Sequence, residues 1–67
     1  MEINEAKRLT QECLSRAYVA LNEARKQLEW ANKFMDSADL CWTNDFADLD
    51  EHLAAGADML RDEIKLL

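Results

Sequence analysis

The sequence contains no proline and a single glycine, Gly56. Collagen-like chains, flexible linkers and β-rich folds all need these residues, so their scarcity excludes those classes. Hydrophobic residues reach 49% of the chain, which is too many for simple disorder. The class that remains is all-α.

Cysteine is also scarce, with only Cys13 and Cys41. If both flank one straight helix they lie ~40 Å apart, which no disulfide within the chain can span. No cysteine pair has zinc-site spacing, and no cofactor or metal is expected. The first residues are acidic and form no apolar leader segment, and no apolar run approaches the ~20 residues of a membrane span. We therefore predict a cytoplasmic protein with reduced thiols and no membrane segment.

A repeat of seven residues dominates the first half of the chain. Large apolar residues alternate with alanines that follow each of them by three positions, so both sets share one helix face. The large set is Leu14, Leu21, Leu28 and Met35, and the small set is Ala17, Ala24, Ala31 and Ala38. This pattern predicts one long amphipathic helix.

A second apolar series, spaced by threes and fours, follows in the rest of the chain: Phe46, Leu49, Leu53, Ala57, Leu60, Ile64 and Leu67. Polar residues between the two series lower helix propensity, and Thr43 or Asn44 is the expected N-cap of the second helix. We predict one domain, 1–67, that forms an antiparallel helical hairpin. Its first helix covers about 3–38, its turn about 39–44 and its shorter second helix about 45–66.

The first helix is too long for the second to cover. Residues before Leu14 continue the apolar or small seam without a partner in the chain, and such a surface usually marks an interface. We predict a homodimeric four-helix bundle. Its expected dimer interface comprises Ile3, Ala6, Leu9, Cys13, Ala20 and Phe34. In length, hairpin topology and alternating core the chain resembles the Rop-type plasmid RNA-binding regulators, which are dimeric four-helix bundles. The resemblance covers most of the chain, includes no specific motif, and implies a fold rather than a function.

Acidic side chains concentrate in the second half. Residues 1–35 hold six basic and five acidic side chains, a balance of +1, whereas residues 36–67 hold two basic and nine acidic ones, a balance of −7. Four carboxylates share the helix face opposite the leucines, and we call them the acidic face: Asp48, Glu51, Asp58 and Asp62. Their spacing resembles the phosphates of a nucleic-acid strand, which favours binding to a basic groove. The alternative is a solvated face that keeps the protein soluble.

The leading functional prediction is a small, acidic, non-enzymatic regulator or inhibitor that binds a basic protein through the acidic face. Its size and composition are typical of phage or mobile-element accessory proteins. Trp30 and Trp42 are candidate aromatic anchors for the partner, because tryptophan is favoured at binding hot spots. The alternative for these two is an aromatic cluster with Phe34 and Phe46 that closes the end of the bundle.

Two other functions stay open. The first is a dimeric RNA-binding regulator that uses a basic and aromatic stripe of the first helix, formed by Arg8, Arg16, Lys26, Trp30 and Lys33. The second is a structural assembly unit without a further ligand.

Catalytic and metal-binding patterns are weak. His52 lies one helical turn after Asp48, but two ligands do not make a metal site, and no second histidine exists. Neither cysteine has a histidine near it in the hairpin. A two-helix chain offers no concave pocket, so no enzymatic activity is expected.

Overall fold

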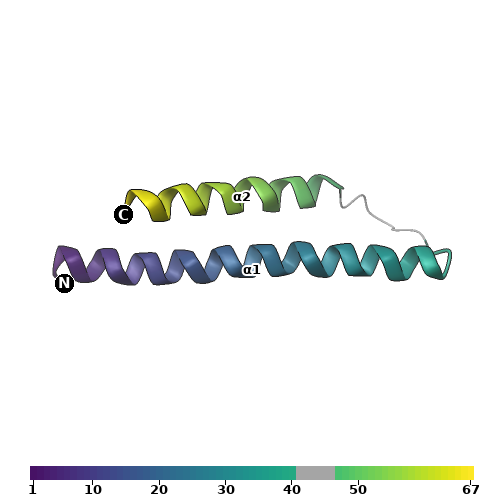
Figure 1. Cartoon of the computed structure of the whole chain (residues 1–67), viewed down its shortest axis with the longest axis horizontal. Coiled ribbons are helices and arrows are strands. Elements are labelled where there is room, and N and C mark those ends of the chain that lie inside the picture. The colour runs from purple at the N-terminus through teal and green to yellow at the C-terminus, as the bar shows by residue number, and fades with distance from the viewer. Residues whose placement is uncertain (41–46) are drawn as a thin grey trace.

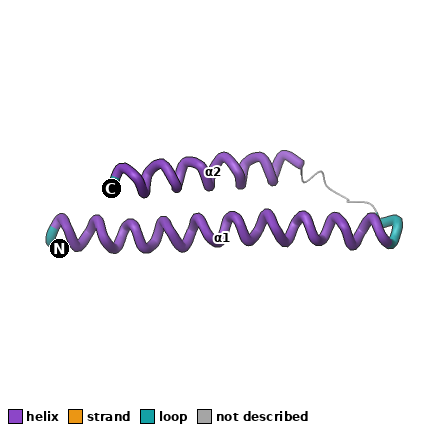
Figure 2. Tube along the Cα trace, in the orientation of Figure 1, coloured by secondary structure: helices purple, strands orange, loops and turns teal. Residues whose placement is uncertain are grey.

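Two antiparallel helices form a hairpin in the computed structural model, which describes residues 1–40 and 47–67. Helix α1 covers Ile3–Ser37 and helix α2 covers Ala47–Leu66, and the two lie side by side (Figure 1). The described residues contain no strand (Figure 2). The predicted all-α hairpin is confirmed, and the helix bounds lie within two residues of those predicted. The expected N-caps of the second helix, Thr43 and Asn44, lie outside the described residues.

The start of α1 lacks a side-chain cap. Glu2 occupies the N-cap position with extended backbone angles, but its carboxylate accepts no hydrogen bond from the first turn. Its carbonyl accepts the first helical bond, from the Ala6 N–H at 2.9 Å. Glu5 in the first turn faces the positive end of the helix dipole, and this is favourable.

The end of α1 is a Schellman motif. The Leu40 N–H donates to the Met35 carbonyl at 2.8 Å, and the Asp39 N–H donates to the Asp36 carbonyl at 3.3 Å. Asp39 stands at the position that usually holds glycine, with φ at +54°. Aspartate tolerates this left-handed conformation better than most side chains, so the helix ends here without a glycine.

The helices meet along the leucine side of α1. Ala57 of α2 is the one residue within the described chain that is buried, at 3% exposure. The leucines around it are half-buried. Leu21 packs at the level of Gly56, where an added Cβ would lie 3.5 Å from Leu21 Cδ1, an ordinary van der Waals distance. The contact between the helices is therefore close, but it does not require glycine.

The alanine side of the predicted seam is only partly covered. Ala17 is half-buried, whereas Ala24 is exposed. The prediction placed both alanines beside the leucines in one arc. Helix α2 packs against the leucines and against Tyr18 and Arg25 on one side of them. The alanines on the other side of the leucines are therefore covered only in part.

Helix α1 extends beyond both ends of α2 (Figure 1). It has 35 residues against 20 in α2, and the hairpin measures 55 × 16 × 16 Å. The N-terminal overhang was expected from the sequence, but the extension at the other end was not. Ile3 is 73% exposed near one end and Phe34 is 67% exposed near the other.

Candidate protein-interaction surfaces

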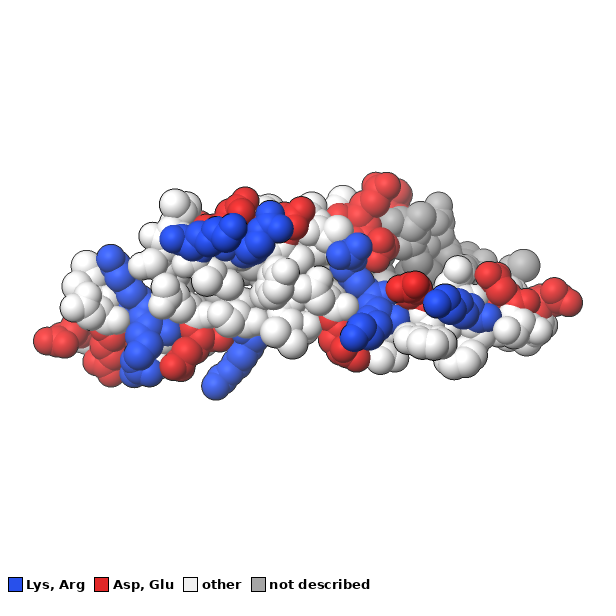
Figure 3. Space-filling model, viewed as in Figure 1, with Lys and Arg blue, Asp and Glu red and all other residues white. Residues whose placement is uncertain are grey.

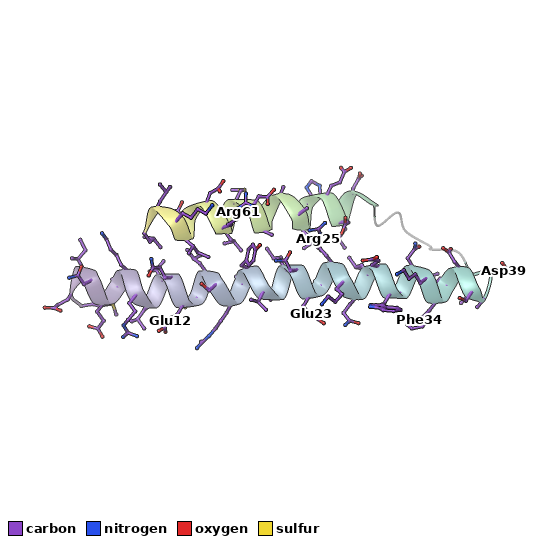
Figure 4. All side chains as sticks on the ribbon, viewed as in Figure 1. Glu12, Glu23, Arg25, Phe34, Asp39 and Arg61 are labelled. Atoms are coloured by element: carbon purple, nitrogen blue, oxygen red, sulfur yellow. The ribbon has the colours of Figure 1, made fainter. Side chains whose placement is uncertain are left out.

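The acidic face lies on the outer side of α2, and all four of its carboxylates are exposed. Arg61 alters it, because its guanidinium lies 3.5 Å from Asp58 and 3.6 Å from Asp62. Arg61 therefore partly neutralises the acidic face in the second half of α2 (Figure 4 labels Arg61). Within the described chain, Asp48 and Glu51 make no ion pair, so the carboxylates of the acidic face that no cation neutralises lie in the first half of α2.

The charge pattern of the surface agrees with this arrangement. On the face drawn in Figure 3, acidic and basic side chains alternate along both helices, and acidic atoms gather where α2 begins. A continuous row of carboxylates comparable to a phosphate backbone is therefore interrupted by Arg61. The sequence contained part of the signal, because Asp58 lies three residues before Arg61, a spacing at which side chains on a helix meet.

Two apolar side chains beside the acidic face were not singled out by the sequence analysis. Met59 is 72% exposed and Leu66 is 80% exposed, and they lie seven residues apart on the outer side of α2. The sequence could have indicated them, because their seven-residue spacing places both on one helix face that the leucine series does not include. A partner of this face would meet apolar as well as negative groups.

Trp30 and Phe34 form an exposed aromatic pair on α1. Their ring centroids lie 6.0 Å apart with an angle of 27° between the planes. The Lys33 ammonium lies 4.8 Å from the centroid of the Trp30 ring, a cation–π contact, and 3.6 Å from Glu29. Trp30 is 50% exposed, so the pair offers a large apolar surface to solvent. Trp42 and Phe46, the other members of the expected cluster, lie outside the described residues.

The basic stripe of α1 is partly neutralised. Arg8 pairs with Glu12 at 3.1 Å, one turn along the helix. Arg16 and Lys26 make no ion pair in the portion of the chain that the structure describes. Arg25, which was not part of the predicted stripe, crosses to α2 and donates from Nε to Asp50 at 3.2 Å. It lies between the helices in Figure 4.

The predicted dimer-interface residues do not serve the hairpin contact. Ile3, Cys13, Ala20 and Phe34 are exposed, and Ala6 and Leu9 are half-buried. Phe34 and, about three turns earlier, Glu23 project from the side of α1 that faces away from α2 (Figure 4). These residues are therefore available for contact with another chain.

Features suited to chemistry are few. A shallow open groove of about 230 Å³ runs between the helices, below the ~300–1,000 Å³ of typical ligand pockets. Its lining is Tyr18, Arg61, Ile64 and Lys65. Across residues 1–40 and 47–67, no three histidine, cysteine or acidic side chains come together in a metal-binding arrangement. Neither helix of the described chain is long and apolar enough to span a membrane.

Comparisons with known proteins give no match. No family model, curated protein or solved structure is significantly similar to the chain.

Proposed function

We propose that the chain is a non-enzymatic, protein-binding regulator or inhibitor that acts as a homodimeric four-helix bundle in the cytoplasm. The observation that carries this proposal is the near absence of burial. Ala57 alone is buried in the described hairpin, while large apolar side chains at both ends and on the outer sides remain exposed. A chain of this size gains only ~3–5 kcal/mol of stability even from a complete core. Exposed apolar surface of this extent favours association with another protein chain.

The acidic face is the proposed contact for a partner other than the chain itself. Asp48 and Glu51 supply negative charge that no described cation neutralises, and Met59 and Leu66 supply apolar area farther along the same outer side of α2. A partner with a basic, partly apolar groove fits this combination. The unequal charge of the chain supports the choice of α2 over α1, because residues 36–67 carry −7 and residues 1–35 carry +1.

Affinity capture from a host lysate, with two sets of isosteric changes, tests this proposal. The first set removes the acidic face: Asp48→Asn, Glu51→Gln, Asp58→Asn and Asp62→Asn. The second set removes the same number of charges from α1 and its N-cap: Glu2→Gln, Glu5→Gln, Glu12→Gln and Glu29→Gln. We expect a protein that is captured by the wild-type chain and by the α1 set, is lost with the acidic-face set, and is weakened by salt. Equal capture by both sets would overturn the role of the acidic face.

RNA binding is the second candidate, because Trp30, Phe34 and Lys33 form an exposed aromatic and cationic surface on which a base can stack. Nuclease treatment in the same capture distinguishes it. Bound material that disappears with nuclease and with Trp30→Ala would favour RNA. A dimer that captures neither protein nor RNA would favour the structural assembly unit.

A further inference from the structure

Two rows of residues run along α1 outside its contact with α2. In each row, a second copy in the reverse order would place complementary side chains opposite one another. The first row is Leu9, Arg16, Glu23 and Trp30, and the second is Ala6, Cys13, Ala20, Gln27 and Phe34. Members of each row are seven residues apart, so a row drifts by only ~20° per step around the helix. The rows lie next to each other on the flank that α2 leaves open.

The first row has the order apolar, positive, negative, apolar. An antiparallel copy of α1 pairs Arg16 with Glu23 of the second copy, and Glu23 with its Arg16, in one register. The same register sets Leu9 against Trp30 at both ends of the contact. Arg16 has no ion-pair partner within the described chain, and Glu23 accepts only a hydrogen bond from Gln27, at 3.0 Å. Both charges are exposed and available to a second copy.

The second row has the same symmetry. Reversed about Ala20, it sets Ala6 opposite Phe34 and Cys13 opposite Gln27, so small residues face large ones. Ala20 faces its own copy at the centre, where the absence of a large side chain permits close approach of the helices. Residue 20 is also the midpoint of α1, Ile3–Ser37. The register that pairs the charges is therefore also the one in which the two helices overlap along their whole length.

We propose that α1 binds α1 of a second copy in antiparallel orientation, with a two-fold axis beside Ala20 and reciprocal Arg16–Glu23 ion pairs. The occupant of the open flank is thus another copy of this chain, through a contact in which each surface meets itself. This inference rests on the proposed homodimer and specifies its interface. The net charge supports it, since α1 surfaces near neutrality do not repel each other as the acidic α2 surfaces do.

This arrangement also explains how a dimer leaves the acidic face free. Because the contact rows lie outside the side of α1 that meets α2, the two α1 helices form the centre of this dimer and the two α2 helices lie on its outer sides. The acidic face lies on the side of α2 opposite its contact with α1, so it stays on the outside. Dimer formation and binding of a basic partner then use separate surfaces.

Charge reversal with rescue tests the ion pairs. Arg16→Glu or Glu23→Arg alone places like charges together twice per dimer, and each is expected to raise the dimer dissociation constant about tenfold at low salt in sedimentation equilibrium. The double variant Arg16→Glu/Glu23→Arg restores the dimer. Lys26→Glu makes the same change in net charge as Arg16→Glu, but away from both rows, and leaves dissociation unchanged. Single variants that match wild type, or a double variant that stays weak, would overturn the register.

Cross-linking tests the orientation. In a chain carrying Cys13→Ser and Cys41→Ser, the change Ala20→Cys is expected to give a covalent dimer on oxidation, whereas Ser15→Cys, on another side of α1, is not. A chain with Cys41→Ser alone keeps Cys13, which faces Gln27 of the second copy, and stays uncross-linked. Cross-linking through Cys13 would show a parallel pair, and a purely monomeric chain would overturn the inference altogether. Neither result depends on the acidic face, so the capture experiment tests the regulator proposal separately.

Discussion

The two helices of the hairpin differ in how much of their surface the contact between them covers. Helix α2 has its apolar side on α1, contributes the buried Ala57 and turns its acidic face outward. Helix α1 is longer, nearly neutral, and has one flank under α2 and another flank open. A single hairpin therefore satisfies the packing of α2 far better than that of α1. The open flank of α1 is therefore the surface that the proposed dimer would bury.

The largest expected effect comes from a charge at the centre of the helix contact. Ala57→Glu places a carboxylate where the side chain is buried, and we expect a loss of more than about 2 kcal/mol in the free energy of unfolding. That loss is a large part of the stability of so small a chain. Urea unfolding followed by circular dichroism at fixed protein concentration measures it.

Ala55→Glu is the matched control, since it adds the same charge to α2 at an exposed position. We expect a change within about 0.5 kcal/mol for this variant. Equal losses in the two variants would contradict the described packing of α2.

The end of α1 gives the next largest effect. Asp39→Gly removes the strain of a side chain at φ +54° and is expected to stabilise the chain by about 0.5–1 kcal/mol. Asp36→Gly removes the same charge three residues earlier, inside the helix, where glycine relieves no strain and is expected to cost about 0.3 kcal/mol relative to aspartate. Thermal unfolding of the two variants should therefore shift in opposite directions. Shifts of the same sign would mean that α1 does not end in a Schellman motif.

A comparable effect is expected where Leu21 meets Gly56. A Cβ at Gly56 would lie in ordinary contact with Leu21, so Gly56→Ala should stabilise the hairpin by about 0.5–1 kcal/mol through helix propensity. Ala55→Gly, its exposed neighbour, should cost a similar amount. Denaturation midpoints measure both changes. Destabilisation by Gly56→Ala would reveal close approach of another chain in solution.

The smallest effect belongs to the ion pair between the helices. Arg25 and Asp50 are each more than a third exposed, so their coupling energy in a double-mutant cycle with alanine is expected to be about 0.2–1 kcal/mol. Screening should reduce it as salt is raised. The Arg8–Glu12 pair, within α1, provides a comparison that does not join the helices. An Arg25–Asp50 coupling of zero at low salt would argue against the observed packing of the helices.

The hairpin was predictable because its signals repeat. Leu14, Leu21 and Leu28 define one helix face by their spacing, and the absence of proline leaves α1 uninterrupted. The end of α1 has a weaker signal in the sequence, because Asp39 takes the left-handed conformation at a position where glycine usually marks the end of a helix. The overhang beyond the start of α2 was not predictable, because helix periodicity does not fix how far one helix is shifted along the other.

The candidate surfaces were predictable only in part. Periodicity placed Asp58 and Asp62 on one face, but it did not weigh the effect of Arg61 between them. It also grouped Ala24 with the leucines, because a heptad pattern does not reveal which flank of a broad apolar arc the second helix will cover. That choice depends on the packing of side chains such as Tyr18 and Arg25 against α2.

The elongated shape of the hairpin has a hydrodynamic consequence. Its radius of gyration is 16.2 Å, whereas a compact chain of this length has about 11 Å. A rod encounters more friction than a sphere of equal mass, so one hairpin elutes from a sizing column ahead of globular standards. An antiparallel pair that overlaps along its length becomes thicker but scarcely longer. Dimerisation therefore doubles the mass while changing the diffusion coefficient comparatively little, and the number of chains is better read from mass than from mobility.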